Sequence, residues 1–176
     1  MENLEVKKYP KFILRKKCKS VQKITAYEEK LFENMLQIMH LSNGIGLAAP
    51  QIGISRQLIV ADIGQGVVKL ANPEILELNG KDKLLEGCLS IPGAEVEIER
   101  AYQIVVRGLN DKGKLVEISA SRLLARVIQH EIDHLKGKLI IDYLSFWKGF
   151  KFRINYLFFA KGKFRPERVE SPERIL

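Results

Sequence analysis

The sequence is poor in the features that disulfide frameworks, membrane spans and secretion signals require. Its 176 residues include only two cysteines, Cys18 and Cys88, and residues 1–19 are charged, without a sustained apolar stretch. No apolar run approaches the roughly 18 residues that cross a bilayer, and the nearest is the short cluster at 156–160. We therefore expect a cytoplasmic protein in a reducing compartment, with no membrane partner.

The net charge of +8 is concentrated at the two ends of the chain. Residues 1–19 hold seven Lys or Arg against two Glu, and residues 148–176 hold eight against three. Clustered basic residues favour an anionic partner such as RNA, although solvated termini would give the same pattern.

The chain has only three histidines, and two of them lie in the segment Gln129-His130-Glu131-Ile132-Asp133-His134. Imidazoles four residues apart project from one face of a helix and can bind one metal ion, with the intervening glutamate placed to transfer protons. The segment favours a metal-dependent hydrolase, and the alternative is an ordinary polar helix face.

A metal site on this helix needs a third ligand, and the sequence offers none downstream. A zinc protease would place a glutamate about twenty residues on or complete H-E-x-x-H-x-x-G-x-x-H, but Ile140 occupies that histidine position. Cys88 is the best remaining candidate. Two imidazoles and a thiolate would leave one tetrahedral position open, as in catalytic sites.

The apolar patterns predict an α+β fold, a single compact domain in which antiparallel strands pack around a central metal-binding helix. The hydrophobic share of 46% is enough for one core. We expect an extended arm over 3–20, a helix from a Thr25 capping box to 42–44, and a metal-binding helix from Ser119 or Ser121 to Gly137. The apolar residues over 150–158 fit a strand as well as a helix, and we favour a C-terminal helix, followed by an extended or disordered tail over 164–176. The expected strands are 57–61, 67–71 (broken by Asn72-Pro73), 95–100, 102–109, 114–118 and 139–141, with 95–118 forming three successive antiparallel strands.

Three segments together resemble the motifs of the peptide deformylase family, G-x-G-L-A-A-P-Q, E-G-C-L-S and Q-H-E-x-D-H. The segments Gly44–Gln51, Glu86–Ser90 and Gln129–His134 match without a substitution and in the same order. The segment from Tyr9 to Arg15 is similar to the family's N-terminal arm, so the resemblance covers roughly residues 4–145. It implies a catalytic domain at 1–147 and a basic, aromatic-rich extension at 148–176.

The resemblance also implies a role for each motif residue. Cys88, His130 and His134 would bind the metal, and Glu131 would act as general base and acid. Gln51 and the backbone amide of Leu89 would form the oxyanion hole. The reaction would be hydrolysis of the N-formyl group from the initiator methionine of nascent polypeptides. The family uses Fe²⁺ and accepts Zn²⁺ or Ni²⁺, whereas the ligand types alone favour zinc.

The same resemblance implies the substrate pocket and the partners. Arg126 stands where many relatives carry an apolar residue near the pocket. We expect N-formylmethionyl nascent peptides as substrates and a transient ribosome contact through the basic C-terminal region, with no DNA partner. The rivals are another metal-dependent amide or peptide hydrolase and a ribosome- or RNA-binding protein with a structural metal. The residues expected to line the methionine pocket and peptide groove are Ile45, Gly46, Glu86, Arg100, Leu123 and Val127.

Overall fold

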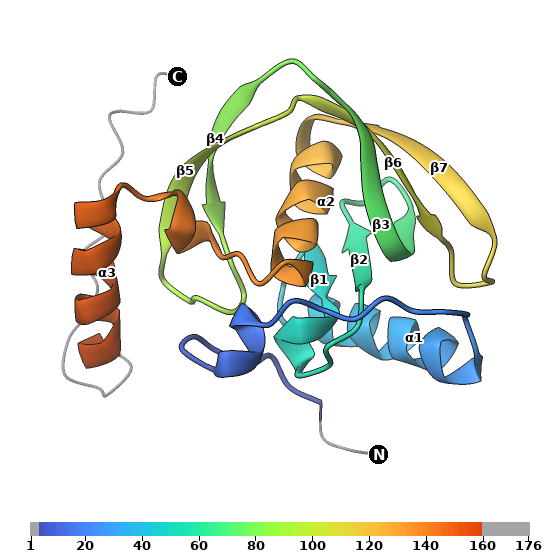
Figure 1. Ribbon diagram of the computed structural model, residues 1–176, viewed down its shortest axis with the longest axis horizontal. Coiled ribbons are helices and arrows are strands. Elements are labelled where there is room, and N and C mark those ends of the chain that lie inside the picture. The colour runs from blue at the N-terminus through green and yellow to red at the C-terminus, as the bar shows by residue number, and fades with distance from the viewer. Residues whose placement is uncertain (1–3, 160–176) are drawn as a thin grey trace.

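A five-stranded antiparallel sheet, in the order β1-β2-β3-β6-β7, forms the centre of the protein. The structure is a computed structural model that describes residues 4–159, with side chains described to Tyr156. Strands β4 and β5 pair separately as a two-stranded hairpin. Helix α2 lies between this hairpin and the main sheet (Figure 1). The strands are β1 (Gly46–Ala48), β2 (Leu58–Asp62), β3 (Val67–Asn79), β4 (Asp82–Gly87), β5 (Glu95–Arg100), β6 (Gln103–Leu109) and β7 (Leu115–Ser121).

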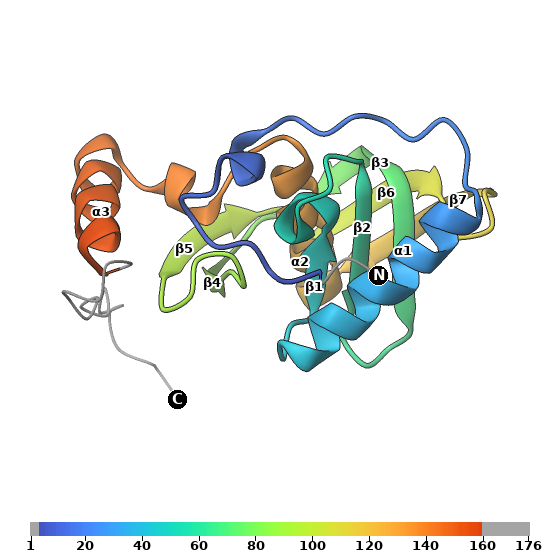
Figure 2. The same cartoon turned by 90° about the horizontal axis from the view of Figure 1, so that it is seen from below.

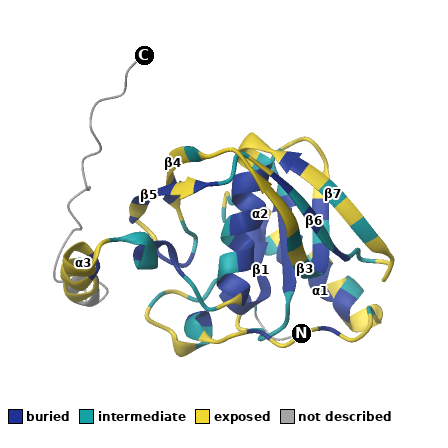
Figure 3. Ribbon diagram, turned by 45° about the horizontal axis from the view of Figure 1, so that its top comes forward, coloured by how far each residue is buried: buried dark blue, intermediate teal, exposed yellow. Residues whose placement is uncertain are grey.

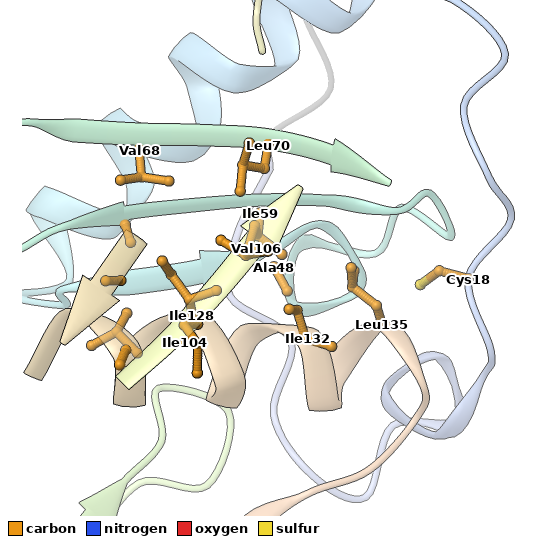
Figure 4. Packing of buried hydrophobic residues seen from close by; sticks show 14 residues of the cluster. Cys18, Ala48, Ile59, Val68, Leu70, Ile104, Val106, Ile128, Ile132 and Leu135 are labelled. Carbon is orange, nitrogen blue, oxygen red and sulfur yellow. The ribbon is translucent and has the colours of Figure 1, made fainter. Parts of the chain in front are cut away.

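Helices cover both faces of the sheet because the strand side chains alternate between two cores. Ile59 and Ala61 of β2 pack towards α2 (Arg122–Leu135), in a core that also contains Ile128, Ile132 and Leu135 (Figure 4). Leu58 and Val60 point the other way, into a core built with α1 (Ala26–Leu41), which lies across the opposite face (Figure 2). The expected single α+β domain with a central helix is therefore confirmed.

The first helix begins and ends where the sequence predicts. Thr25 and Glu28 form the capping box, in which the Thr25 N–H donates to the Glu28 carboxylate at 3.0 Å. After Leu41 the chain turns, and the Gly44 N–H donates to the Met39 carbonyl at 2.9 Å. This turn delivers the Gly44–Gln51 segment to the centre of the molecule, as β1 followed by the 3₁₀ turn η2 (Ala49–Ile52).

Four expectations about local structure are wrong in detail. Strand β3 continues through Asn72-Pro73 with a register shift between Ala71 and Glu74, where Asn72 adopts a φ of 51°. Strand β4 was not expected at all. Its partner β5 pairs with β4 alone, so the segments from 95 to 118 are not three neighbouring strands. Residues Ile140–Tyr143 form a 3₁₀ turn, η3, in place of the expected strand at 139–141.

The two ends of the chain agree more closely with expectation. The N-terminal arm is extended apart from one 3₁₀ turn, η1 (Phe12–Arg15). The expected C-terminal helix is confirmed as α3 (Phe146–Phe159), which lies apart from the main sheet and exposes much of its surface (Figures 1 and 3). The boundary expected between 147 and 148 falls within α3 and stays a prediction, and the tail at 164–176 lies outside the described residues. None of the described helices has the length and apolarity to cross a membrane.

Candidate metal centre and active site

Helix α2 carries both histidines of the candidate centre, and the turn after β4 carries the cysteine. The ligand atoms of Cys88, His130 and His134 lie within 4.8 Å of one another. Cys88 Sγ is 3.2 Å from His134 Nε2, and the two imidazole rings are 5.0 Å apart between centroids. This set of one thiol and two imidazoles fits a single divalent cation and leaves a coordination position open. Cys18, the other cysteine, is buried in the core beside Leu135.

Glu86 orients the first histidine of the pair. One of its carboxylate oxygens lies 2.9 Å from His130 Nδ1, so the proton on that nitrogen is held by Glu86 and Nε2 faces the cluster. Burial raises the pKa of Glu86, but hydrogen bonds from His130 and Arg100 outweigh it and lower that pKa to about 2. Glu86 is therefore an anion that fixes the histidine in the orientation a metal ligand needs.

The two histidines differ in how readily they carry a proton. Burial and the positive charge of His130 lower the pKa of His134 well below its usual value, which keeps it neutral, as metal binding requires. Burial also opposes charge on His130, but hydrogen bonds to Cys88 and Glu86 prevail and raise its pKa to about 10. A cation held between the thiolate and the imidazoles would take the place of that proton.

Glu131 is buried beside the cluster with a free oxygen. Its Oε2 has no hydrogen-bond partner among the described residues, and the same is true of His134 Nδ1. Burial raises the pKa of Glu131 to about 7, although the positive charges of His130 and Arg100 act against this rise. A carboxylate with a pKa near neutrality and an unpaired oxygen is suited to accept and return a proton.

Gln51 points its amide nitrogen towards the cysteine. Its Oε1 accepts the Ala48 N–H at 2.7 Å, which leaves Nε2 facing Ser90 Oγ at 3.3 Å and Cys88 Sγ at 3.7 Å. No described residue accepts the backbone N–H of Leu89. Gln51 Nε2 is thus one N–H donor at the edge of the cluster, and the Leu89 N–H, next to Cys88 in the chain, is a second donor without an acceptor among the described residues.

A cavity of about 730 Å³ opens onto the cluster. Most of the residues expected to bind substrate line it, namely Ile45, Gly46, Glu86, Leu123 and Val127. Arg100 does not. Its guanidinium lies behind Glu86, bonded to that carboxylate at 2.6 and 2.9 Å and to Asp133 at 2.9 Å. The expectation that Arg100 lines the pocket is therefore wrong, and its contact with the site runs through Glu86.

Arg126 helps to line the cavity, and its guanidinium is bonded within the protein. Its guanidinium donates to Glu86 at 2.7 Å, to the Ile98 carbonyl at 2.8 Å and to the Asp82 carbonyl at 2.8 Å, so it ties α2 to the β4–β5 hairpin. Arg126 precedes His130 by four residues, a spacing that puts both on one face of α2. Leu85, Gly93, Ala94 and Glu95 also line the cavity and were missed, because β4 and its pairing with β5 were not expected.

Comparison with known proteins agrees with this geometry. A sequence model of the polypeptide deformylase family matches residues 3–149. A peptide deformylase of Carboxydothermus hydrogenoformans is 50% identical over 130 residues, covering 74% of this chain and 86% of the relative. The crystal structure of a peptide deformylase from Legionella pneumophila superimposes with a TM-score of 0.84 at 38% identity, covering 93% of this chain and 99% of the other. That of the Ehrlichia chaffeensis enzyme in complex with actinonin gives 0.86 at 34% identity, covering 92% and 99%. The chain belongs to the polypeptide deformylase family, metal-dependent enzymes that remove the N-formyl group from nascent peptides.

Proposed function

We propose that Cys88, His130 and His134 hold one Fe²⁺ ion per chain, with Zn²⁺ or Ni²⁺ able to replace it. The ligand cluster supports a divalent cation, and the resemblance to the family supports iron over the zinc that the ligand types alone would favour. When bound, the ion supplies Lewis acidity, which polarises the formyl carbonyl and lowers the pKa of a water molecule.

Glu131 is the proposed general base and acid, and its unpaired buried oxygen beside the cluster is the observation that carries the proposal. It accepts a proton as the oxygen of water bonds to the formyl carbon. It then returns that proton to the amine nitrogen as the carbon–nitrogen bond breaks. The products are formate and a peptide with a free amino terminus.

Gln51 and Leu89 are the proposed donors to the developing oxyanion. The contacts of Gln51 with Ala48 and Ser90 hold its Nε2 in place, and the Leu89 N–H has no competing acceptor among the described residues, which supports their role as donors to the negative oxygen. The residues Ile45, Gly46, Glu86, Leu123 and Val127 are proposed to bind the methionine side chain and the start of the peptide. We expect actinonin, which the Ehrlichia chaffeensis structure contains, to compete for this cavity.

Formate release from a formyl-Met peptide by the anaerobically iron-loaded protein tests the proposal. The acetyl-Met peptide of the same sequence is the matched control, because it differs by one methyl group at the reacting carbonyl. We expect rapid release of formate and slow or no release of acetate. Equal hydrolysis of both peptides, or hydrolysis within the peptide, would contradict the proposed activity.

We further propose that the protein works in the cytoplasm and contacts the ribosome through α3 and the basic residues that follow it. Helix α3 exposes Phe146 and Trp147, at 78% and 76%, beside Lys148, Lys151 and Arg153, and its described part carries no acidic residue. Anionic RNA would attract such a surface. Cosedimentation with ribosomes should weaken when the chain is truncated after Ser145, and equal cosedimentation of the two chains would refute the contact.

A further inference from the structure

The N-terminal arm bonds to both segments that carry the proposed oxyanion donors. The Lys7 N–H donates to the Gln51 carbonyl at 2.7 Å, and the Tyr9 N–H donates to the Ser90 carbonyl at 2.8 Å. Between them, Lys8 Nζ donates to the Leu89 carbonyl at 2.5 Å. Three consecutive residues of the arm thus bind η2 on one side and the turn after β4 on the other.

These two segments have little other backbone connection. Within residues 4–159, no backbone hydrogen bond joins η2 directly to the turn at 88–91. Their direct polar contacts run through the Gln51 side chain, which reaches Ser90 Oγ and Cys88 Sγ. The distance between the Gln51 and Leu89 donors therefore depends on the N-terminal arm as well as on the Gln51 side chain, which is itself one of the donors.

The turn at 88–91 has a hydrogen bond on each of its first three carbonyls. The Cys88 carbonyl accepts the Ile91 N–H at 2.9 Å, the Leu89 carbonyl accepts Lys8, and the Ser90 carbonyl accepts Tyr9. Because a peptide group is planar, the bond from Ile91 to the Cys88 carbonyl fixes the direction of the Leu89 N–H in the same peptide group, and Lys8 and Tyr9 fix the two peptide groups that follow. The Leu89 N–H is then held from its own peptide group and restrained by the next one, and no residue between 4 and 159 accepts it.

We propose that Lys8 is a positioning residue for the reaction: its ammonium group holds the Leu89–Ser90 peptide group and so restrains the turn in which the preceding Cys88–Leu89 peptide group presents the Leu89 N–H. The inference rests on the proposed oxyanion role of the Gln51 and Leu89 donors. Lys8 is the only side chain among the three arm contacts, so it can be changed without altering the backbone hydrogen bonds of Lys7 and Tyr9.

A substitution at Lys8 should act on turnover more than on substrate binding. Donors to an oxyanion bond most strongly in the transition state, so their misalignment lowers kcat and leaves KM nearly unchanged. Lys8→Met removes a charged donor from an exposed contact where water competes, so it should lower kcat about three- to tenfold. Lys8→Arg keeps a cationic donor and should restore most of the turnover.

The test is to measure kcat, KM and the thermal midpoint of wild type, Lys8→Met, Lys8→Arg and Lys11→Met with a formyl-Met peptide. Lys11 is an exposed lysine of the same arm whose side chain has no hydrogen bond or ion pair among the described residues, so Lys11→Met should match wild type. A selective loss of kcat in Lys8→Met with rescue by Lys8→Arg supports the proposal.

Two results would overturn it while leaving the proposed function intact. One is wild-type kcat in Lys8→Met. The other is a loss that Lys8→Arg fails to rescue, or one that raises KM and lowers the thermal midpoint together, because either would mark a purely structural role. A wild-type protein that releases no formate would instead overturn the proposed function, and the positioning role with it.

Discussion

Replacing Gly46 by alanine should disable the proposed site at a lining residue that supplies no side-chain group to the reaction. Gly46 opens β1, which faces α2. A β-carbon built at Gly46 would lie 2.4 Å from Glu131 Oε1 and 2.6 Å from Val127 Cγ1. Both distances are far below normal carbon contacts, and both neighbours are buried side chains of α2, so the proposed base itself would have to move.

The size of the effect follows from these two contacts. Relieving the shorter one moves the Glu131 carboxylate by about 1 Å, a displacement that costs roughly 10²-fold in rate at a catalytic group. Overpacking a core position costs about 1–3 kcal/mol of stability. For a chain of this size, that loss corresponds to a fall of roughly 2–12 °C in the thermal midpoint.

The assay is formate release together with thermal unfolding, on samples of matched metal content. Gly149→Ala is the control, because it also adds a methyl group at a buried glycine, yet its β-carbon would meet nothing closer than 3.7 Å. We expect Gly149→Ala to keep activity and stability. Wild-type turnover in Gly46→Ala would refute the inferred close packing of β1 against Glu131.

Three further predictions concern stability and the metal site. Asn72→Ala should lower the free energy of unfolding by about 2–4 kcal/mol. The Asn72 side chain bonds the N–H and the carbonyl of Val21 at 2.8 and 2.7 Å, and the Asn72 backbone has a positive φ, which alanine disfavours. A loss below about 0.5 kcal/mol in urea unfolding would contradict this expectation. Although burial raises the pKa of Asp142, hydrogen bonds from Arg15 and the Leu139 N–H lower it below its ordinary value of 3.8. The resulting stabilisation is present above pH 3.8 and is lost as the pH falls from there through the lower pKa of the folded protein. Asp142→Asn should therefore lose less stability than wild type on acidification, and parallel pH profiles would count against the ion pair. Glu86→Gln should weaken metal binding about 10–100-fold in a chelator competition, and unchanged affinity would refute its role in orienting His130.

The local patterns predicted the elements whose signals lie within a few residues. The Thr25–Glu28 capping box and the glycine at 44 bounded α1, and alternating apolar residues located β5, β6 and β7. Asn72-Pro73 predicts a break in the strand, because proline cannot donate to a neighbouring strand. The strand continues there because Asn72 bonds Val21, a residue 51 positions away, and no local pattern contains that contact.

In the candidate site too, features that depend on local spacing were predictable, and features that depend on long-range packing were not. The spacing of His130 and His134, with Glu131 between them, predicted a metal-binding helix, and the three motifs brought Cys88 and Gln51 to it. H-E-x-x-H alone favoured a protease, and the absent downstream ligand excluded that reading. The Arg100–Glu86–Arg126 network was not predictable from spacing, since it exists only because the β4–β5 hairpin packs against α2.

The central claim is that the buried carboxylate of Glu131 transfers the proton at a Cys/His/His metal centre. The most direct measurement compares formate release by wild type and Glu131→Gln, with the metal content of both samples determined beforehand. Glutamine keeps the size of the side chain and removes its ability to accept a proton, so we predict equal metal content and a fall in kcat of about 10²–10⁴-fold. Equal turnover by the two proteins would contradict the claim.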